Sequence, residues 1–135
     1  MSDTLQFELV TPEKLAVSKA VAMVEVPGEM GDFGVLPGHA PFMSIIRPGV
    51  ISVHEAGDSK TCYFVPAGYA EVNPDGCIVL AEHIRDMADV TVEQAEKELE
   101  IAKLDFEEAK EDADKKLAAK AYDVAQVFLA AAKNK

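Results

Sequence analysis

The residues that could carry catalysis are few and lie far apart in the sequence. His39, His54 and His83 are isolated and lie beside different strand-like runs, so their spacing does not suggest a metal site. No serine lies in a G-x-S-x-G elbow. The glycine-rich segment 28–38 matches neither G-x-x-x-x-G-K-[ST] nor G-x-G-x-x-G, the usual phosphate-binding patterns. We therefore expect no catalytic residue, no metal site and no cofactor in this chain.

The two cysteines, Cys62 and Cys77, do not form a redox or zinc-binding pair. They are separated by 15 positions and both lie in apolar, strand-like runs. A C-x-x-C spacing would indicate metal binding or thiol exchange, and it is absent from the sequence. We expect buried free thiols in a reducing compartment.

The glycine-rich segment has a second interpretation. Residues 31–41 read GDFGVLPGHAP, which packs three glycines and two prolines around Asp32 and His39. One interpretation is a pair of tight turns with only a structural role. The other is a rigid loop that displays Asp32 and His39 for binding, because loops held by a rigid scaffold commonly carry function. The spacing alone does not choose between them.

Glycine and proline divide the chain into two parts. All 8 Gly and 7 Pro lie between Pro12 and Gly76, and none occurs in the 59 residues that follow. In the first part, short apolar runs are separated by turn residues, and Leu5, Phe7 and Leu9 alternate with polar neighbours as in a half-buried strand. Roughly nine such runs predict an antiparallel sandwich or barrel.

The second part has the period of a helix. From Asp89 onward, apolar residues recur at spacings of three and four, as in a coiled coil: Val92, Ala95, Leu99, Ala102, Phe106, Ala109, Ala113, Leu117, Ala121, Val124, Phe128 and Ala131. Thr91 and Gln94 form a capping box that predicts the helix start. An antiparallel hairpin that turns near residues 112–114 and one unbroken helix over residues 91–132 both fit, since no Gly or Pro marks a turn.

Charge and hydropathy exclude several classes. The net charge of −11 disfavours nucleic-acid binding, which needs clustered Lys and Arg. No stretch approaches 18 consecutive apolar residues, and residues 1–10 lack the features of a signal or transit peptide. We expect a protein that does not itself enter a membrane.

Four segments together resemble one known family. The sequence GDFGVLPGHAP at 31–41, followed by 46–49 (IRPG), 68–72 (GYAEV) and 79–82 (VLAE), resembles the ε subunit family of F-type ATP synthase, whose mitochondrial counterpart is called δ. The segments occur in the family's order, and the resemblance covers nearly the whole chain. It implies a β-sandwich of about ten antiparallel strands in residues 1–88, followed by a C-terminal α-helical hairpin in residues 89–135.

The resemblance also implies a function and partners. A member of this family is a non-catalytic rotor subunit of the central stalk that links the γ subunit to the c-ring and couples proton transport to ATP synthesis. Carried over, Gly31, Asp32 and Phe33 form a turn that faces the polar loops of the c-ring. His39, Ala40 and Pro41 form part of the γ contact. Membrane association comes only through the complex, at the cytoplasmic face of the bacterial inner membrane or, alternatively, at the thylakoid membrane.

The helical tail carries two further expectations. In the family it switches between a hairpin and an extended form that reaches the α/β catalytic head and limits ATP hydrolysis. Some members bind ATP through [IL]-D-x-x-R-A, but here residues 90–95 read VTVEQA, with Thr91 and Gln94 in place of Asp and Arg. Because the charged contacts are lost, we predict weak or absent ATP binding.

Two functions outside this family remain alternatives. The first is a free-standing sandwich adaptor whose tail recruits a partner helix. The second is a small hydrolase, which would need a clustered nucleophile and base that the sequence does not contain.

Overall fold

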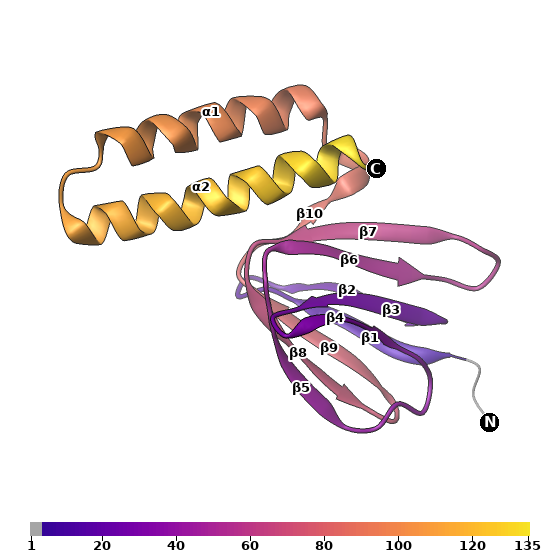
Figure 1. The fold of residues 1–135 in the computed structure, drawn as a ribbon. Coiled ribbons are helices and arrows are strands. Elements are labelled where there is room, and N and C mark those ends of the chain that lie inside the picture. The colour runs from indigo at the N-terminus through magenta and orange to yellow at the C-terminus, as the bar shows by residue number, and fades with distance from the viewer. Residues whose placement is uncertain (1–3) are drawn as a thin grey trace. The chain divides into compact units, whose positions relative to one another are not determined.

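The computed structural model describes residues 4–135, and it divides into two compact units that meet between Ala88 and Asp89. The first unit is formed by strands and a short 3₁₀ helix, and the second by two helices (Figure 1). The expected first unit began at residue 1, and its first three residues lie outside the described part. The strands are β1 (Leu5–Val10), β2 (Leu15–Val21), β3 (Met23–Gly28), β4 (Gly31–Val35), β5 (Phe42–Ile46), β6 (Gly49–His54), β7 (Lys60–Val65), β8 (Gly68–Asn73), β9 (Gly76–Ala81) and β10 (Arg85–Asp86).

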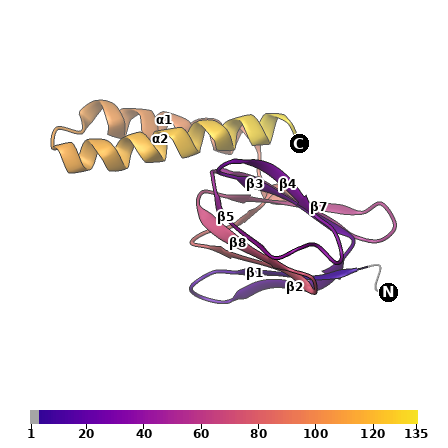
Figure 2. The ribbon, with the colours of Figure 1, turned by 60° about the horizontal axis from the view of Figure 1, so that its bottom comes forward.

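The strands form one sheet that folds over on itself. Its order is β10-β7-β6-β3-β5-β8-β9-β1-β2, with β4 added to β3. The layers join where β3 meets β5 through the single pair Gly28 and Ile46, and the sheet turns there from one layer to the other (Figures 1 and 2). This sandwich confirms the expected fold class.

One strand pair departs from the antiparallel expectation. β1 runs parallel to β9, with Phe7 opposite Cys77 and Leu9 opposite Val79. No hairpin connects these strands, because β1 opens the chain and turns directly into β2. An alternating pattern predicts which face of a strand is buried but not its direction, so the sequence offered no signal for this pair.

The core lies between the two layers and consists of large aliphatic and aromatic side chains. Phe7 and Leu9 from one layer and Ile51 and Val53 from the other are fully buried. The alternation seen in the sequence at Leu5, Phe7 and Leu9 places all three in this core. β2 carries a weak sequence signal, because LAVSKAV alternates poorly and most of its residues are exposed or half-buried.

The second unit is a helical hairpin. α1 spans Val92–Glu108 and α2 spans Asp112–Lys133. The turn was expected near residues 112–114 but consists of residues 109–111, with extended backbone at Ala109 and Glu111. Asp112 and Asp114 lie in the first turn of α2, where acidic side chains are stabilised by the positive end of the helix dipole.

Small side chains dominate the buried positions of the hairpin. Ala95, Ala102, Ala125 and Ala132 are buried, and Phe128 is the only large residue buried within α1 and α2 as described. The predicted stripe is buried or half-buried in α1 as far as Ala102, but it is wrong at Phe106, which is 40% exposed, and in the first half of α2, where Leu117 is 70% exposed. Neither helix is long and apolar enough to cross a membrane.

Candidate docking surfaces

The first predicted site lies at one end of β3 and β4. These strands form a hairpin whose tip is Glu29 and Met30, and Met30 is 97% exposed. Gly31 has a φ of +133°, a conformation that favours glycine, and ends the turn. Gly31, Asp32 and Phe33, which were expected to form the ring-facing turn, lie in β4 directly after the turn residues.

A second turn supports this tip. The Glu29 N–H donates to the Ile45 carbonyl at 2.8 Å, and the Arg47 N–H donates to the Pro27 carbonyl at 3.0 Å. The Arg47 guanidinium also donates to Asp32 Oδ1. The hairpin tip is therefore held to the β5–β6 turn at three points. Sequence reasoning missed this pairing, because a separation of 15 residues leaves no local signal.

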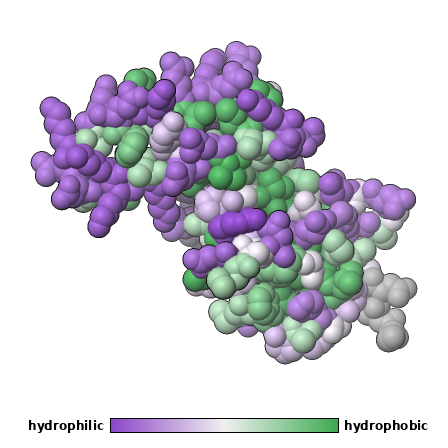
Figure 3. All heavy atoms as spheres, in the orientation of Figure 1, coloured by the Kyte–Doolittle hydropathy of each residue, from purple (hydrophilic) through white to green (hydrophobic). Residues whose placement is uncertain are grey.

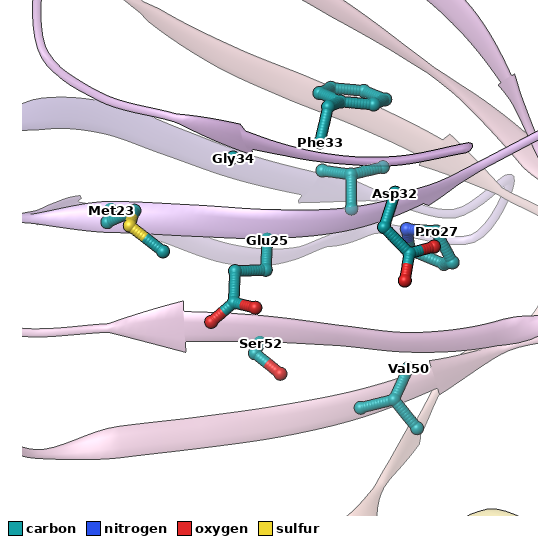
Figure 4. A pocket seen from close by; sticks show the side chains of 9 residues that line it. Met23, Glu25, Pro27, Asp32, Phe33, Gly34, Val50 and Ser52 are labelled. Carbon is teal, nitrogen blue, oxygen red and sulfur yellow. The ribbon is translucent and has the colours of Figure 1, made fainter. Parts of the chain in front are cut away.

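The outer surface beside the tip is hollowed. A hollow of about 410 Å³ is lined by Met23, Glu25, Val26, Pro27, Asp32, Phe33, Gly34, Val50 and Ser52. In Figure 4 the carboxylates of Glu25 and Asp32 lie along this hollow. Glu25 Oε1 also lies 2.5 Å from His54 Nε2. The hollow therefore offers carboxylate acceptors to a polar or basic partner.

The second predicted site lies at the opposite end of the same strands. His39, Ala40 and Pro41 follow β4 and precede β5, whereas Gly31 begins β4. The His39 N–H donates to the Leu36 carbonyl at 3.1 Å, and the Gly38 N–H donates to the Pro74 carbonyl at 3.1 Å. The loop is thus fixed to the β8–β9 turn. The structure therefore keeps the two predicted sites apart.

An apolar row crosses the outer face of the layer that β5, β8, β9, β1 and β2 form. Register pairs align Ile45 with Tyr69, Tyr69 with Leu80, Leu80 with Val10, and Val10 with Leu15. Four of these five side chains are 39% to 60% exposed, and Val10 is half-buried. Contiguous exposed apolar surface is a common feature of interaction sites, so the row is a candidate docking surface. Sequence reasoning missed the row because its members come from five strands.

Apolar surface is unevenly distributed over the molecule. In Figure 3 apolar atoms cover much of the visible sandwich, whereas polar side chains dominate the visible surface of the helices. Beside the row, a hollow of about 340 Å³ is lined by Val10, Thr11, Pro12, Ala67, Gly68, Leu80, Ala81 and Glu82. The row and this hollow share Val10 and Leu80, so they form one surface with a depression at its edge.

The residues of the degenerate ATP motif serve the helix. Thr91 is the N-cap of α1, and its Oγ1 accepts a hydrogen bond from the Gln94 N–H at 3.1 Å, as the capping box predicted. Both side chains are exposed. This hydrogen bond explains where α1 begins. It carries no information about ATP binding.

Burial shifts the pKa of two side chains of the sandwich, Cys77 and Tyr63. Burial raises the pKa of the Cys77 thiol to about 12, so this thiol stays protonated at neutral pH. Burial also raises the pKa of Tyr63. Cys62 is half-buried, with Sγ 3.7 Å from Ser52 Oγ. Within residues 4–135, no three His, Cys, Asp or Glu side chains gather as a metal site would require.

Known proteins similar to this chain agree with the fold. Residues 4–87 match the family model described as "ATP synthase, Delta/Epsilon chain, beta-sandwich domain". An ATP synthase epsilon chain from Rhodospirillum rubrum is 45% identical over 98% of this chain and 99% of its own length. A relative of the same name from Paramagnetospirillum magneticum is also 45% identical, over 97% and 98%.

Solved structures show the same fold. A chain in the Euglena gracilis mitochondrial ATP synthase superimposes with a TM-score of 0.84 at 21% identity, covering 97% of this chain and 82% of that one. A chain in the central stalk and c-ring structure from Tetrahymena thermophila gives 0.70 at 14% identity, covering 95% and 96%. The family model and the near full-length relatives show that the chain belongs to the ATP synthase delta/epsilon chain family.

Proposed function

We propose that this chain is a non-catalytic rotor subunit of an F-type ATP synthase, linking the γ subunit to the c-ring. The observation that carries the proposal is the apolar row of Ile45, Tyr69, Leu80, Val10 and Leu15 on a rigid sandwich. An exposed apolar face of this kind suits a permanent protein contact, because its burial against a partner is favourable. In the complex, γ covers this face and extends to His39, Ala40 and Pro41.

The c-ring contact lies at the tip of the β3–β4 hairpin. Glu29 lies in the turn and Asp32 lies beside it in β4, and both are exposed acidic residues. Backbone hydrogen bonds hold this tip in place. Such a tip suits a polar loop that offers donors, and a rigid tip transmits torque better than a flexible loop. Coupling of proton transport to ATP synthesis then requires only that the sandwich move as one body with γ and the ring.

Membrane association follows from the complex alone. The subunit is peripheral, at the cytoplasmic face of the bacterial inner membrane, with the thylakoid membrane as the alternative. Chains of this fold occur in a solved assembly of OSCP, F1 and c-ring and in one of the central stalk and c-ring, which supports this association.

The main test introduces a charge into the apolar row. Ile45→Asp adds a carboxylate at a side chain that is 60% exposed, so the sandwich still folds. We expect co-purification with the α, β and γ subunits to fall at least tenfold, since burying an unpaired carboxylate is costly. Leu117→Asp, at a hairpin leucine that is 70% exposed, is the matched control and leaves co-purification unchanged. A wild-type chain that does not co-purify with these subunits would support the adaptor function instead.

The helical unit regulates hydrolysis by leaving the hairpin state and reaching the α/β head. The turn at residues 109–111 contains no Gly or Pro, and Ala-rich contacts leave large side chains such as Ile101 exposed. These features leave the difference in free energy between hairpin and extended helix small. Deletion of residues 89–135 in the assembled complex is expected to raise ATP hydrolysis. Unchanged hydrolysis would rule out a brake.

ATP binding by this unit is weak or absent. Thr91 and Gln94 replace the charged residues of the family motif, and the Thr91 hydroxyl already accepts the Gln94 backbone N–H as the cap of α1. Calorimetric titration of the chain with ATP is expected to give no measurable heat at micromolar ligand. A micromolar affinity would contradict this.

A further inference from the structure

Arg47 and Asp32 form an ion pair that joins the β3–β4 hairpin to the β5–β6 turn. The family function does not explain this pair. Asp32 lies on β4, opposite Pro27 of β3, and Arg47 lies in the turn between β5 and β6. The guanidinium of Arg47 donates to Asp32 Oδ1, and the two side chains are 44% and 71% exposed. The pair therefore lies at the surface of the candidate ring contact and not in the core.

The backbone around this pair is already fixed. The Arg47 N–H bonds the Pro27 carbonyl, and the Glu29 N–H bonds the Ile45 carbonyl. A Cβ on Gly49 would lie 2.9 Å from Pro27 Cβ, so the two turns are in close contact without the ion pair. Because these backbone contacts already hold the two segments together, the exposed ion pair adds little to the stability of the sandwich. Its main consequence is the direction and charge of the Asp32 carboxylate.

We propose that Arg47 is a positioning residue for the ring contact: it holds Asp32 by one oxygen and directs the other toward a donor on the polar loop of a ring subunit. This inference rests on the proposed function. A carboxylate has two oxygens with about four acceptor sites, so Arg47 leaves Oδ2 able to accept from a partner. An Asp32 side chain held in one rotamer loses less entropy on binding than a free one.

The charge of the tip identifies the partner's chemistry. Glu29 and Asp32 carry two negative charges, and Arg47 carries one positive charge, so the tip remains acidic with the pair formed. The hollow beside it adds Glu25. The complementary partner is a polar loop that presents a cationic or amide donor next to an apolar depression for Met30.

The test measures binding of labelled full-length chain to a detergent-solubilised complex of γ and the c-ring that lacks this subunit. Arg47→Gln is expected to weaken binding about three- to fivefold, the upper part of the range of exposed charge pairs. Asp32→Asn is expected to weaken binding by a similar factor. The double variant is expected to bind no more weakly than either single variant, because the two residues act as a unit. Arg47→Lys keeps the charge and recovers most of the affinity.

The charge swap separates positioning from a structural role. Asp32→Arg combined with Arg47→Asp restores an ion pair between the two turns but presents a cation to the ring. We expect normal thermal unfolding together with binding at least as weak as that of Arg47→Gln. Binding of the swapped variant at wild-type affinity would overturn the proposal, since the pair would then only join the two turns.

The control removes a different ion pair of the same unit. Lys19→Gln breaks the Lys19–Glu55 pair and is expected to leave ring binding unchanged. If Arg47→Gln binds as tightly as wild type, the positioning role fails and the proposed function stands. If the wild-type chain shows no saturable binding to the complex of γ and the c-ring, the proposed function itself fails.

Discussion

The sandwich and the helical hairpin are held together by different means. The sandwich buries Phe7, Leu9 and Ile51 completely and fixes its turns with glycine and proline. The hairpin buries mainly alanines and leaves Leu117 and Ile101 at least 60% exposed. Because burial of large apolar side chains supplies most of the stability of a fold, one polypeptide carries a rigid unit and a unit that is easily opened. The proposed role, a load-bearing sandwich with a helical unit that changes conformation, would use this division.

The largest expected difference between the two units comes from truncating one aromatic residue in each. Phe7→Ala removes a side chain of zero exposure and is expected to cost about 3–5 kcal/mol of unfolding free energy. Phe106→Ala, at a residue 40% exposed that contacts Tyr122 at a centroid distance of 5.9 Å, is expected to cost about 1 kcal/mol. Urea denaturation followed by circular dichroism measures both. Equal losses would mean that the hairpin core is as tightly packed as the sandwich.

A proline in the hairpin turn tests how weakly that turn is encoded. Glu111 has φ −79°, which a proline ring accepts, whereas proline inside an unbroken helix costs about 3 kcal/mol. Glu111→Pro is therefore expected to shift the chain to the hairpin, and Glu111→Ala toward the extended helix.

Electron paramagnetic resonance measures this shift as the distance between spin labels at positions 97 and 120, in a chain whose native cysteines are replaced. An unbroken helix separates these positions by about 35 Å. We expect Glu111→Pro to remove any distance of that length and Glu111→Ala to increase its share. A single short distance in both variants would contradict a weakly encoded turn.

The sandwich also depends on places where the backbone approaches too closely for a side chain. A Cβ on Gly68 would lie 2.2 Å from the Leu80 carbonyl oxygen, whereas one on Gly34 would lie 3.8 Å from the nearest atom, Met23 Cε. Gly68→Ala is expected to cost about 2–3 kcal/mol, since β8 and β9 must separate. Gly34→Ala is expected to change stability by about 0.5 kcal/mol or less. Thermal unfolding of the two variants compares them, and similar melting temperatures would contradict this account.

The sequence predicted what is local and missed what depends on pairing. The alternation at Leu5, Phe7 and Leu9 and the cap at Thr91 are local patterns, and both predictions are confirmed. The parallel pairing of β1 with β9, the Arg47–Asp32 pair and the apolar row join residues far apart in the chain. Periodicity within one segment carries no information about which segment lies beside it. The turn of the hairpin was predicted near residues 112–114, where Asp112 and Asp114 in fact begin α2. Acidic residues favour both turns and helix starts, so their presence does not distinguish the two.

The smallest expected effect tests whether the two units open independently. Thr91→Ala removes the hydroxyl that accepts the Gln94 N–H and is expected to cost α1 about 1 kcal/mol. Native-state hydrogen exchange should then accelerate about fivefold at the amides of Gln94 and Ala95, with no change in β9. Thr91→Ser retains the hydroxyl and should restore slow exchange. If the amides of β9 accelerate as much as those of α1, the two units unfold as one, and a helical unit that opens while the sandwich stays rigid is no longer tenable.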